Sequence, residues 1–420
     1  MSRAWLLALA LAGCTSEDNL GNHVFGDARW SVAIGSPGQD RATALAVDPI
    51  GNVIVAGTCD GLVDFGSTRA DCRGSFITRR AWDTGREEWT AVLAHATVAS
   101  VHIDERGSVV VAGMQQTATG SDPFVATYDG AGVLQTIAGF GHIGTAVATA
   151  GAIEPDGCIY MTGGFHGTMP TPEGPMTNQS GQLDGYVSGH FDSGGAWTVR
   201  FGGDSDQLGR ALALRGEHLS VIAQASAPLR IADQTVEAAV YPASVLLQLS
   251  ILGDVQWTRA LPGASEHLAV APDSSIVVTE LDAAMACTRL RGFDVAGREL
   301  WATPCVGQRS TDAIAIGVDG TIVSGGRNFD LQSGELFLAA HAADGRPLGS
   351  TSAQPYPFER DSSLDAIAIE PTGEVAFVGS VNHPFDFGNG MLSFHGMHDA
   401  VIVKLDSPSG HDGPVVLLRE

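Results

Sequence analysis

Histidines bring this chain closest to the residue spacing of a metal site. His395 and His398 lie three residues apart and Asp399 follows directly, so two imidazoles and a carboxylate could meet. A second group of histidines lies within one predicted repeat of the chain: His142, His166 and His190. Protein metal sites need three or four ligands held by further hydrogen-bonding partners, and neither group supplies such a set. We therefore predict no metal ion and no cofactor.

Other reactive motifs are missing from the sequence. It contains no G-x-S-x-G, no phosphate-binding loop and no H-E-x-x-H. Acidic residues occur in predicted turns, at Asp60, Asp64 and Asp83, but without the ligand spacing of a calcium loop. The chain has 47 acidic and 23 basic residues, a formal net charge of −24, which makes it a poor ligand for the nucleic acid backbone. We expect these turn carboxylates to be solvated, and we expect no nucleic-acid partner.

The N-terminus has a basic residue, an apolar run and a small-residue segment in the order that is typical of a cleaved signal peptide. Arg3 precedes an apolar run from Trp5 to Ala12, which is too short to span a bilayer. The run ends in LAGC (11–14), which resembles the lipobox of bacterial lipoproteins. That resemblance implies that residues 1–13 are a lipoprotein signal peptide and that Cys14 is acylated as the mature N-terminus. Residues 14–27 are then the lipidated Cys and a polar tether. Thr15 after the Cys favours transport to the outer membrane of the cell envelope. Both the periplasmic and the surface face of that membrane stay as alternatives.

Five further cysteines remain, and the oxidising envelope permits disulfides among them. Cys287 and Cys305 lie on two predicted antiparallel strands that a turn at 294–297 joins, within one residue of directly opposed positions. Cys59 and Cys72 bracket a loop and would close it. Cys158 has no local partner, so we expect a buried thiol.

A repeat of about 54 residues, measured from Ala42 to Ala366, positions these groups. Seven copies of a hairpin pattern occur at 42–57, 99–113, 149–164, 210–224, 267–280, 312–326 and 365–379. Each is an alternating apolar segment, an acidic or glycine turn and a second apolar segment, which is typical of two antiparallel strands. A second hairpin follows each copy. We therefore predict an all-β fold in which residues 28–420 form a single seven-bladed β-propeller of four-stranded antiparallel blades.

Each terminus offers a strand that could close this ring. Residues 30–34 match a fourth strand yet precede the first copy, and VVLLR (415–419) is a second choice. Borrowing a strand from the other terminus leaves the last blade without a free edge. We favour the N-terminal strand, because Trp30 and its spacing to Ala42 match the internal copies.

Several phrases carry a family resemblance. DPIGNVIVAG (48–57), VDFG (63–66) and DFGNGMLSFHGMHDAVIVKLD (386–406) resemble bacterial β-propeller repeats of the SBBP type. The resemblance covers about residues 28–406. It implies an extracytoplasmic propeller and no defined activity.

A second resemblance concerns tryptophan. WDTGREEW (82–89) and DVAGRELW (294–301) resemble a phrase of pyrroloquinoline quinone propellers, in which Asp and Gly form a turn and Trp docks between blades. We predict this docking role for the following residues: Trp30, Trp89, Trp197, Trp257 and Trp301. The alcohol-oxidising enzymes also use two adjacent cysteines, which this chain lacks. The same phrase occurs in non-catalytic envelope propellers.

Two functional classes follow. The first is a lipid-anchored, non-catalytic binding or scaffold module, whose partners are the membrane and an unknown envelope protein or glycan. The alternative is a quinoprotein-like or hydrolytic enzyme with its site in the central channel. Small apolar residues on the first strands predict a filled channel and favour the first class. A convergent charged cluster at one mouth would favour the second.

Overall fold

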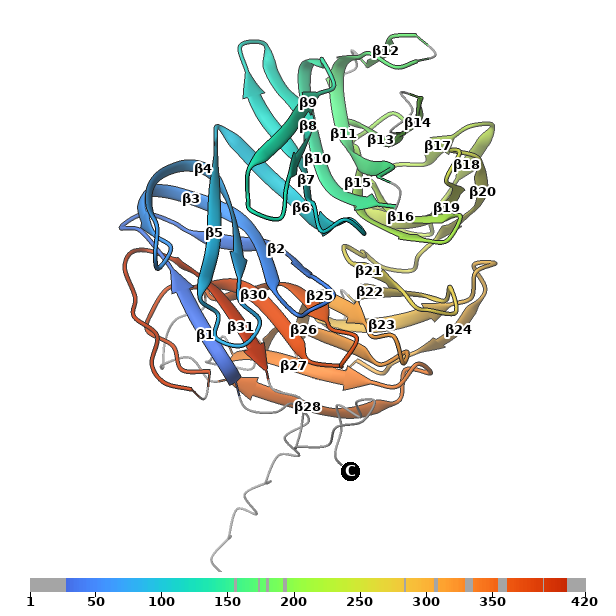
Figure 1. The fold of residues 1–420 in the computed structure, drawn as a ribbon. Coiled ribbons are helices and arrows are strands. Elements are labelled where there is room, and N and C mark those ends of the chain that lie inside the picture. The colour runs from blue at the N-terminus through green and yellow to red at the C-terminus, as the bar shows by residue number, and fades with distance from the viewer. Residues whose placement is uncertain are drawn as a thin grey trace, which may run out of the picture.

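The computed structural model describes residues 28–405, except 155–156, 173, 179–180, 192–194, 283–284, 306–308, 329–334, 354–360 and 388. Every regular element in this part of the chain is a β-strand (Figure 1). Within the same residues, no helix is long and apolar enough to cross a membrane. The predicted signal peptide, Cys14, the tether and the VVLLR segment lie outside the described residues.

Five sheets contain four antiparallel strands each. The first two are β2 (Arg41–Val47), β3 (Val53–Asp64), β4 (Arg69–Arg80) and β5 (Glu87–Ala94), and β15 (Gln207–Arg215), β16 (His218–Ala225), β19 (Ala243–Ser250) and β20 (Val255–Ala260). The next two are β21 (Leu268–Val270), β22 (Ile276–Asp282), β23 (Cys287–Phe293) and β24 (Glu299–Ala302), and β25 (Arg309–Ile316), β26 (Ile322–Asn328), β27 (Glu335–His341) and β28 (Pro347–Ala353). The last is β29 (Ser363–Ile369), β30 (Val375–Val381) and β31 (Asp399–Leu405) with β1 (Ala28–Ile34).

The sixth sheet has eleven strands, which differs from the uniform four predicted. It contains β6 (Ala96–Ile103), β7 (Val109–Thr117), β8 (Gly120–Tyr128), β9 (Leu134–Gly139), β10 (Ile143–Ile153), β11 (Ile159–Met169), β12 (Met176–Asn178), β13 (Asp184–His190), β14 (Ala196–Gly202), β17 (Leu229–Ile231) and β18 (Gln234–Val236). One parallel pair, Thr145 with Ser121, joins β10 to β8. The Ser121 hydroxyl donates to the Ala146 carbonyl at 2.6 Å and draws the two edges together. The β17–β18 hairpin adds to the edge of β14.

The first strands of the sheets form a closed ring. β2 contacts β6, β6 contacts β10, β10 contacts β15, and β15 contacts β21. β21 contacts β25, β25 contacts β29, and β29 returns to β2. In Figure 1 the outer strands β20, β24 and β28 lie on the rim of this ring.

The N-terminal strand closes the ring, as predicted for residues 30–34. β1 pairs antiparallel with β31, with Ser31 opposite Val403 and Ile34 opposite Ala400. The two ends of the described chain therefore lie in one sheet. Without β1, β31 would present a free strand edge, which is a template for aggregation.

Antiparallel order divides the connections between two faces of the ring. On what we call the turn face, tight turns join strands one to two and three to four. In the first of them, the Gly51 N–H donates to the Asp48 carbonyl at 2.9 Å. On the loop face, connections run from strand two to three and from one sheet to the next. These include long segments such as 226–242 and 382–398. Variation in length is therefore concentrated on the loop face.

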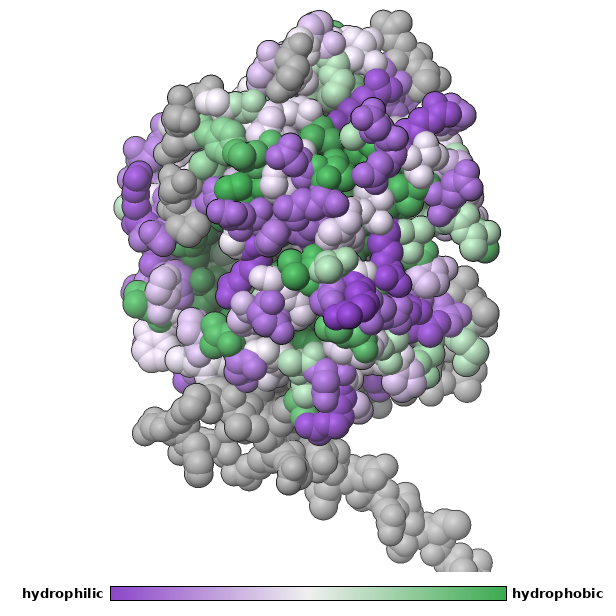
Figure 2. All heavy atoms as spheres, turned by 90° about the vertical axis from the view of Figure 1, so that its right-hand side faces the viewer, coloured by the Kyte–Doolittle hydropathy of each residue, from purple (hydrophilic) through white to green (hydrophobic). Residues whose placement is uncertain are grey.

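Apolar layers between adjacent sheets hold the ring together. One layer joins Tyr160 of β11 and Trp197 of β14 to Leu219 and Leu247 of the next sheet, all of them buried. Each fully buried side chain of this size contributes about 1.5–3 kcal/mol. On the side that carries β20 and β24, hydrophobic residues occur in separate groups among hydrophilic ones (Figure 2).

Candidate functional site

A column of bulged residues surrounds the centre of the ring near the loop face. Six first strands contain a one-residue register shift, as between Ala42 and Ala44 in β2. In the seventh, β21 begins directly after the equivalent residue, His267. The seven residues are Thr43, Ala99, Thr149, Arg210, His267, Asp312 and Asp365. A bulge leaves its extra residue outside the ladder and re-aims the side chain, so this column can present functional groups.

Charged members of this column occupy neighbouring sheets. Arg210, Asp312 and Asp365 lie on the first strands β15, β25 and β29, and His267 directly precedes β21. Arg41 of β2 follows them around the ring. Asp312 and Arg210 both act electrostatically on His267, and Arg41 and Asp312 both act on Asp365. We call these five residues the charged arc. Thr43, Ala99 and Thr149 are the uncharged members of the column.

Burial perturbs two groups of the charged arc. Burial lowers the pKa of His267, and the nearby carboxylates of Asp312 and Glu266 only partly oppose this change. Burial raises the pKa of Asp365, against the hydrogen bond from Ser363 and the positive charge of Arg41. Groups whose pKa values are shifted by burial beside specific charged partners are candidates for a functional site.

Local hydrogen bonds already hold the side chains of the arc. Arg210 Nε donates to Gln224 Oε1 at 2.8 Å. Arg327 Nε lies 3.3 Å from Asp312 Oδ2, and the Ser363 hydroxyl donates to Asp365 Oδ2 at 2.8 Å. Fixed acids and bases of this kind suit recognition of a charged ligand, because their orientation does not have to be acquired on binding.

The charged arc departs from the predicted small apolar channel. Ala, Val and Ile do recur along the first strands, but the bulge turns one additional side chain per strand out of the alternating pattern. The same bulge makes Ala44, rather than Ala42, the equivalent of Ala366. The sequence clue was the residue directly before the recurring apolar segment, as Asp312 precedes AIAI (313–316).

The histidines do not assemble into one site. His395 Nδ1 lies 2.9 Å from Asp399 Oδ2, whereas His398 Nε2 faces Asp361 at 3.3 Å. His166 pairs with Thr145 and His190 pairs with Ile159, which places them at opposite ends of β11. Among the described residues, no three His, Cys, Asp or Glu side chains are arranged to hold a metal ion.

The predicted tryptophans lie between neighbouring sheets in a repeated geometry. Each sits on the fourth strand of one sheet and meets the turn between strands three and four of the next. The indole N–H of Trp30 donates to the Trp82 carbonyl at 3.0 Å, and that of Trp89 donates to Gly130 at 3.2 Å. Further indole N–H groups donate at 2.9 Å as follows: Trp197 to Ile251 and Trp257 to Val295.

A turn glycine faces each of these indole rings. A Cβ added to Gly132 would lie 2.5 Å from Trp89, and one added to Gly253 would lie 2.8 Å from Trp197. Trp301 faces Gly345 in the same way. The turn glycine therefore serves two ends, since it completes the turn at positive φ and leaves room for the neighbouring indole.

Both predicted cysteine pairs are at disulfide distance. Cα–Cα separations are 5.6 Å for Cys59–Cys72 and 5.9 Å for Cys287–Cys305. Cys158 is buried, as predicted, and belongs to neither pair. The predicted placement of Cys305 on a strand was wrong, because β24 ends at Ala302. Pro304 lacks the N–H that would continue the ladder.

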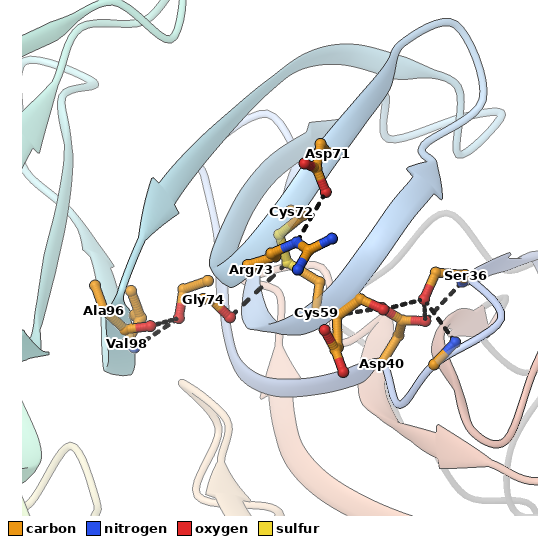
Figure 3. The surroundings of a disulfide bond; sticks show 12 residues. Ser36, Asp40, Cys59, Asp71, Cys72, Arg73, Gly74, Ala96 and Val98 are labelled. Atoms are coloured by element: carbon orange, nitrogen blue, oxygen red, sulfur yellow. Dashed lines mark hydrogen bonds and ion pairs between the residues drawn. A yellow bond between two sulfur atoms is a disulfide. The ribbon is translucent and has the colours of Figure 1, made fainter.

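The first pair spans strands rather than the predicted loop. Cys59 of β3 pairs with Gly74, and Cys72 of β4 pairs with Gly61, so the bridge crosses the hairpin diagonally (Figure 3). Both glycines have positive φ. Beyond these glycines the tip of the hairpin folds back onto its own sheet. The Ser67 N–H in the tip donates to Glu87 Oε2 of β5 at 2.8 Å. The disulfide thus braces the bend of a folded-back hairpin.

Comparison with known proteins identifies the fold. No family model matches the chain, and no curated protein matches it. Among solved structures, the WD40 domain of Neurospora crassa Pan2 is 9% identical with a TM-score of 0.52, covering 92% of this chain and 98% of that one. The WD40 β-propeller domain of Doa1 is 11% identical with a TM-score of 0.51, covering 90% and 96%. BamB from Moraxella catarrhalis is 11% identical with a TM-score of 0.43, covering 90% and 92%. The chain is a β-propeller.

Proposed function

We propose that this chain is a lipid-anchored β-propeller of the bacterial outer envelope that acts as a non-catalytic binding or scaffold module. One observation carries the proposal: the long connections and the charged arc share the loop face, whereas the turn face has short, repeated turns. Variable loops on a rigid scaffold are where binding residues concentrate in proteins. The loop face is therefore the binding face.

The charged arc suggests the kind of partner. Arg210 and Arg41 flank Asp312 and Asp365 around the ring, so neither sign of charge dominates. A polypeptide carries both charges and complements such a surface, which favours a protein partner over a glycan.

We also infer a seven-bladed ring. The eleven-stranded sheet contains two four-stranded groups, β6 to β9 and β10 with β11, β13 and β14, which only one parallel pair connects. Together with the five separate sheets they account for the cycle of first strands.

The anchor rests on the sequence of the leader. Cys14→Ser should abolish labelling by a fatty-acid analogue and release the protein into the soluble envelope fraction. A variant that stays wholly in the membrane pellet would contradict lipid anchoring through this residue.

The binding role is tested with the lipidated full-length protein. We would cross-link it in its own envelope, purify it, and compare wild type with the pair Arg210→Gln and Asp312→Asn. Arg298→Gln on the turn face is the control, because its ion pair with Asp294 is exposed. We expect the cross-linked partner to be lost only from the loop-face variant. Equal capture by all three proteins would place the interface elsewhere.

The charged arc also gives the enzyme alternative one observation, because it is a convergent charged cluster near one mouth. Purified protein should be offered dye-linked alcohol and model ester substrates. Turnover that Asp365→Asn removes, without any captured partner, would reverse the order of the two proposals.

A further inference from the structure

Two joints of the ring lack a tryptophan at the docking position. After β28 the residue is Gly349, opposite Ala340, and the chain that follows β31 there lies outside the described residues. The other joint is the one after β9.

Trp89 lies opposite Arg79, directly after a bulge in the fourth strand of its sheet. Trp257 opposite Gln248 repeats this arrangement. In the next sheet after β2–β5, the residue at this register position is Thr136, opposite Thr127 and also after a bulge. Thr136 therefore replaces the docking indole between β9 and the sheet that follows.

A cavity of about 470 Å³ lies where the indole is missing. Thr127, Thr136, Phe140 and His190 line it. Pro170 and Pro172 of the connection after β11 also line it. Its volume falls in the range of about 300–1,000 Å³ that is typical of small-ligand sites.

The walls of the cavity suit a flat aromatic ring with one hydrogen-bond donor. Phe140 and His190 present rings whose centroids are 4.3 Å apart at an edge-to-face angle. The Thr136 hydroxyl donates to the Thr127 hydroxyl at 3.2 Å, which leaves acceptor lone pairs on the Thr136 oxygen. An indole N–H could donate to them, as the indoles of other joints donate to a backbone oxygen.

Access to the cavity is from the rim. Every residue of β9 is exposed, unlike the partly buried fourth strands β5, β14 and β20. Leu134 and Ile137 on this strand are among the exposed large hydrophobic residues of the protein. A ligand can therefore reach the cavity without opening the ring.

We propose that the cavity beside Thr136 is a binding site for an indole ring, filling the place that tryptophan fills in other joints. The ring could belong to a free aromatic compound or to a Trp side chain of a polypeptide. The cavity reaches loop-face connections at Phe140, Pro170 and Pro172, but it contains no residue of the charged arc, so its test does not depend on the partner proposed there.

Titration calorimetry and thermal shift with free indole test the proposal on the full-length protein. We expect saturable binding of one indole and a rise in Tm. Thr136→Trp should weaken indole binding at least tenfold and raise Tm without ligand, because its own ring occupies the cavity. Indole binding of equal strength to wild type and Thr136→Trp, or none to wild type, would overturn the proposal.

A second variant keeps the test informative if Thr136→Trp fails to fold. Trp257→Thr opens the equivalent place in another joint and should raise the number of bound indoles from one to two. Its Tm should then rise more with indole than that of wild type. A single bound indole in both proteins, with equal shifts in Tm, would contradict the assignment of these joints as indole sites.

Two further probes separate the sources of the ring. N-acetyltryptophanamide presents the ring with one peptide unit, and the peptide Val-Thr-Trp-Thr-Val adds an extended backbone that can pair with β9. If the peptide binds more tightly than indole, a polypeptide source is supported. If indole binds as tightly as the peptide, a free aromatic compound is supported. If none of the three probes binds, the proposed indole site is overturned.

Discussion

Lys404 Nζ lies 2.5 Å from Glu370 Oε1 inside the sheet that closes the ring. It is the only lysine of the chain, and its side chain is fully buried. It also lies 3.0 Å from Glu374 Oε2 and donates to the Gly51 carbonyl of the next sheet at 3.2 Å. One ammonium group thus joins β31 to the β29–β30 turn of its own sheet and to the β2–β3 turn of the next sheet.

Lys404→Met should weaken closure strongly. Removing one partner of a buried ion pair leaves Glu370 uncompensated and typically costs about 3–5 kcal/mol. The measurement is the urea midpoint of the full chain. Arg298→Met, which breaks the exposed pair with Asp294, should change stability by less than about 1 kcal/mol. Equal midpoints for the two variants would show that Lys404 does not support the closure.

The packing of indole rings on turn glycines predicts that alanine costs more stability at Gly132 than at Gly107, although the two glycines have the same φ. Gly107 and Gly132 both have φ of +80°, but an added Cβ meets nothing within 4 Å at Gly107 and the Trp89 ring at 2.5 Å at Gly132. Gly107→Ala should therefore cost about 1–2 kcal/mol from backbone strain alone. Gly132→Ala should cost clearly more. Matching losses in thermal unfolding would mean that Trp89 does not pack on this turn.

Peptide mapping without reduction tests the two cysteine pairs. We expect linked peptides that join Cys59 to Cys72 and Cys287 to Cys305, with Cys158 in neither. Replacing both Cys287 and Cys305 by Ser should cost about 3 kcal/mol in the loop-entropy model for their separation of 18 residues. Reduced thiols at both positions in protein taken from an oxidising envelope would refute the pairing.

Acid should destabilise the fold through a buried histidine. Burial lowers the pKa of His102 from 6.5 to about 4, against a hydrogen bond with the Gly151 backbone. The unfolded chain binds the proton more tightly, so the contribution of His102 to stability is complete above pH 6.5 and is lost as the pH falls towards 4. His102→Gln should flatten the pH dependence of the urea midpoint in this window. An unchanged slope would contradict the burial of a neutral ring.

Much of the fold was predictable because its determinants are local in sequence. Alternating segments with Asp-x-x-Gly turns predicted the hairpins, and the Trp spacing predicted β1 as the closing strand. The bulge residues were missed, since a bulge depends on pairing and not on composition. The segment between Cys59 and Cys72 was predicted as a loop, whereas β3 and β4 continue through it with positive φ at Gly61 and Gly74. Thr136 became informative only when its register matched that of Trp89.

Site-specific photo-crosslinking tests the central claim, that the loop face holds the partner. The probe would replace Val240, Met285 or Met397 on the loop face, and Ile50, Leu252 or Val318 on the turn face. All six side chains are between 60% and 70% exposed, so access to the probe is matched. Irradiated in its own envelope, the protein should give a discrete cross-linked species from loop-face positions only. Cross-links from the turn face, with none from the loop face, would contradict the account.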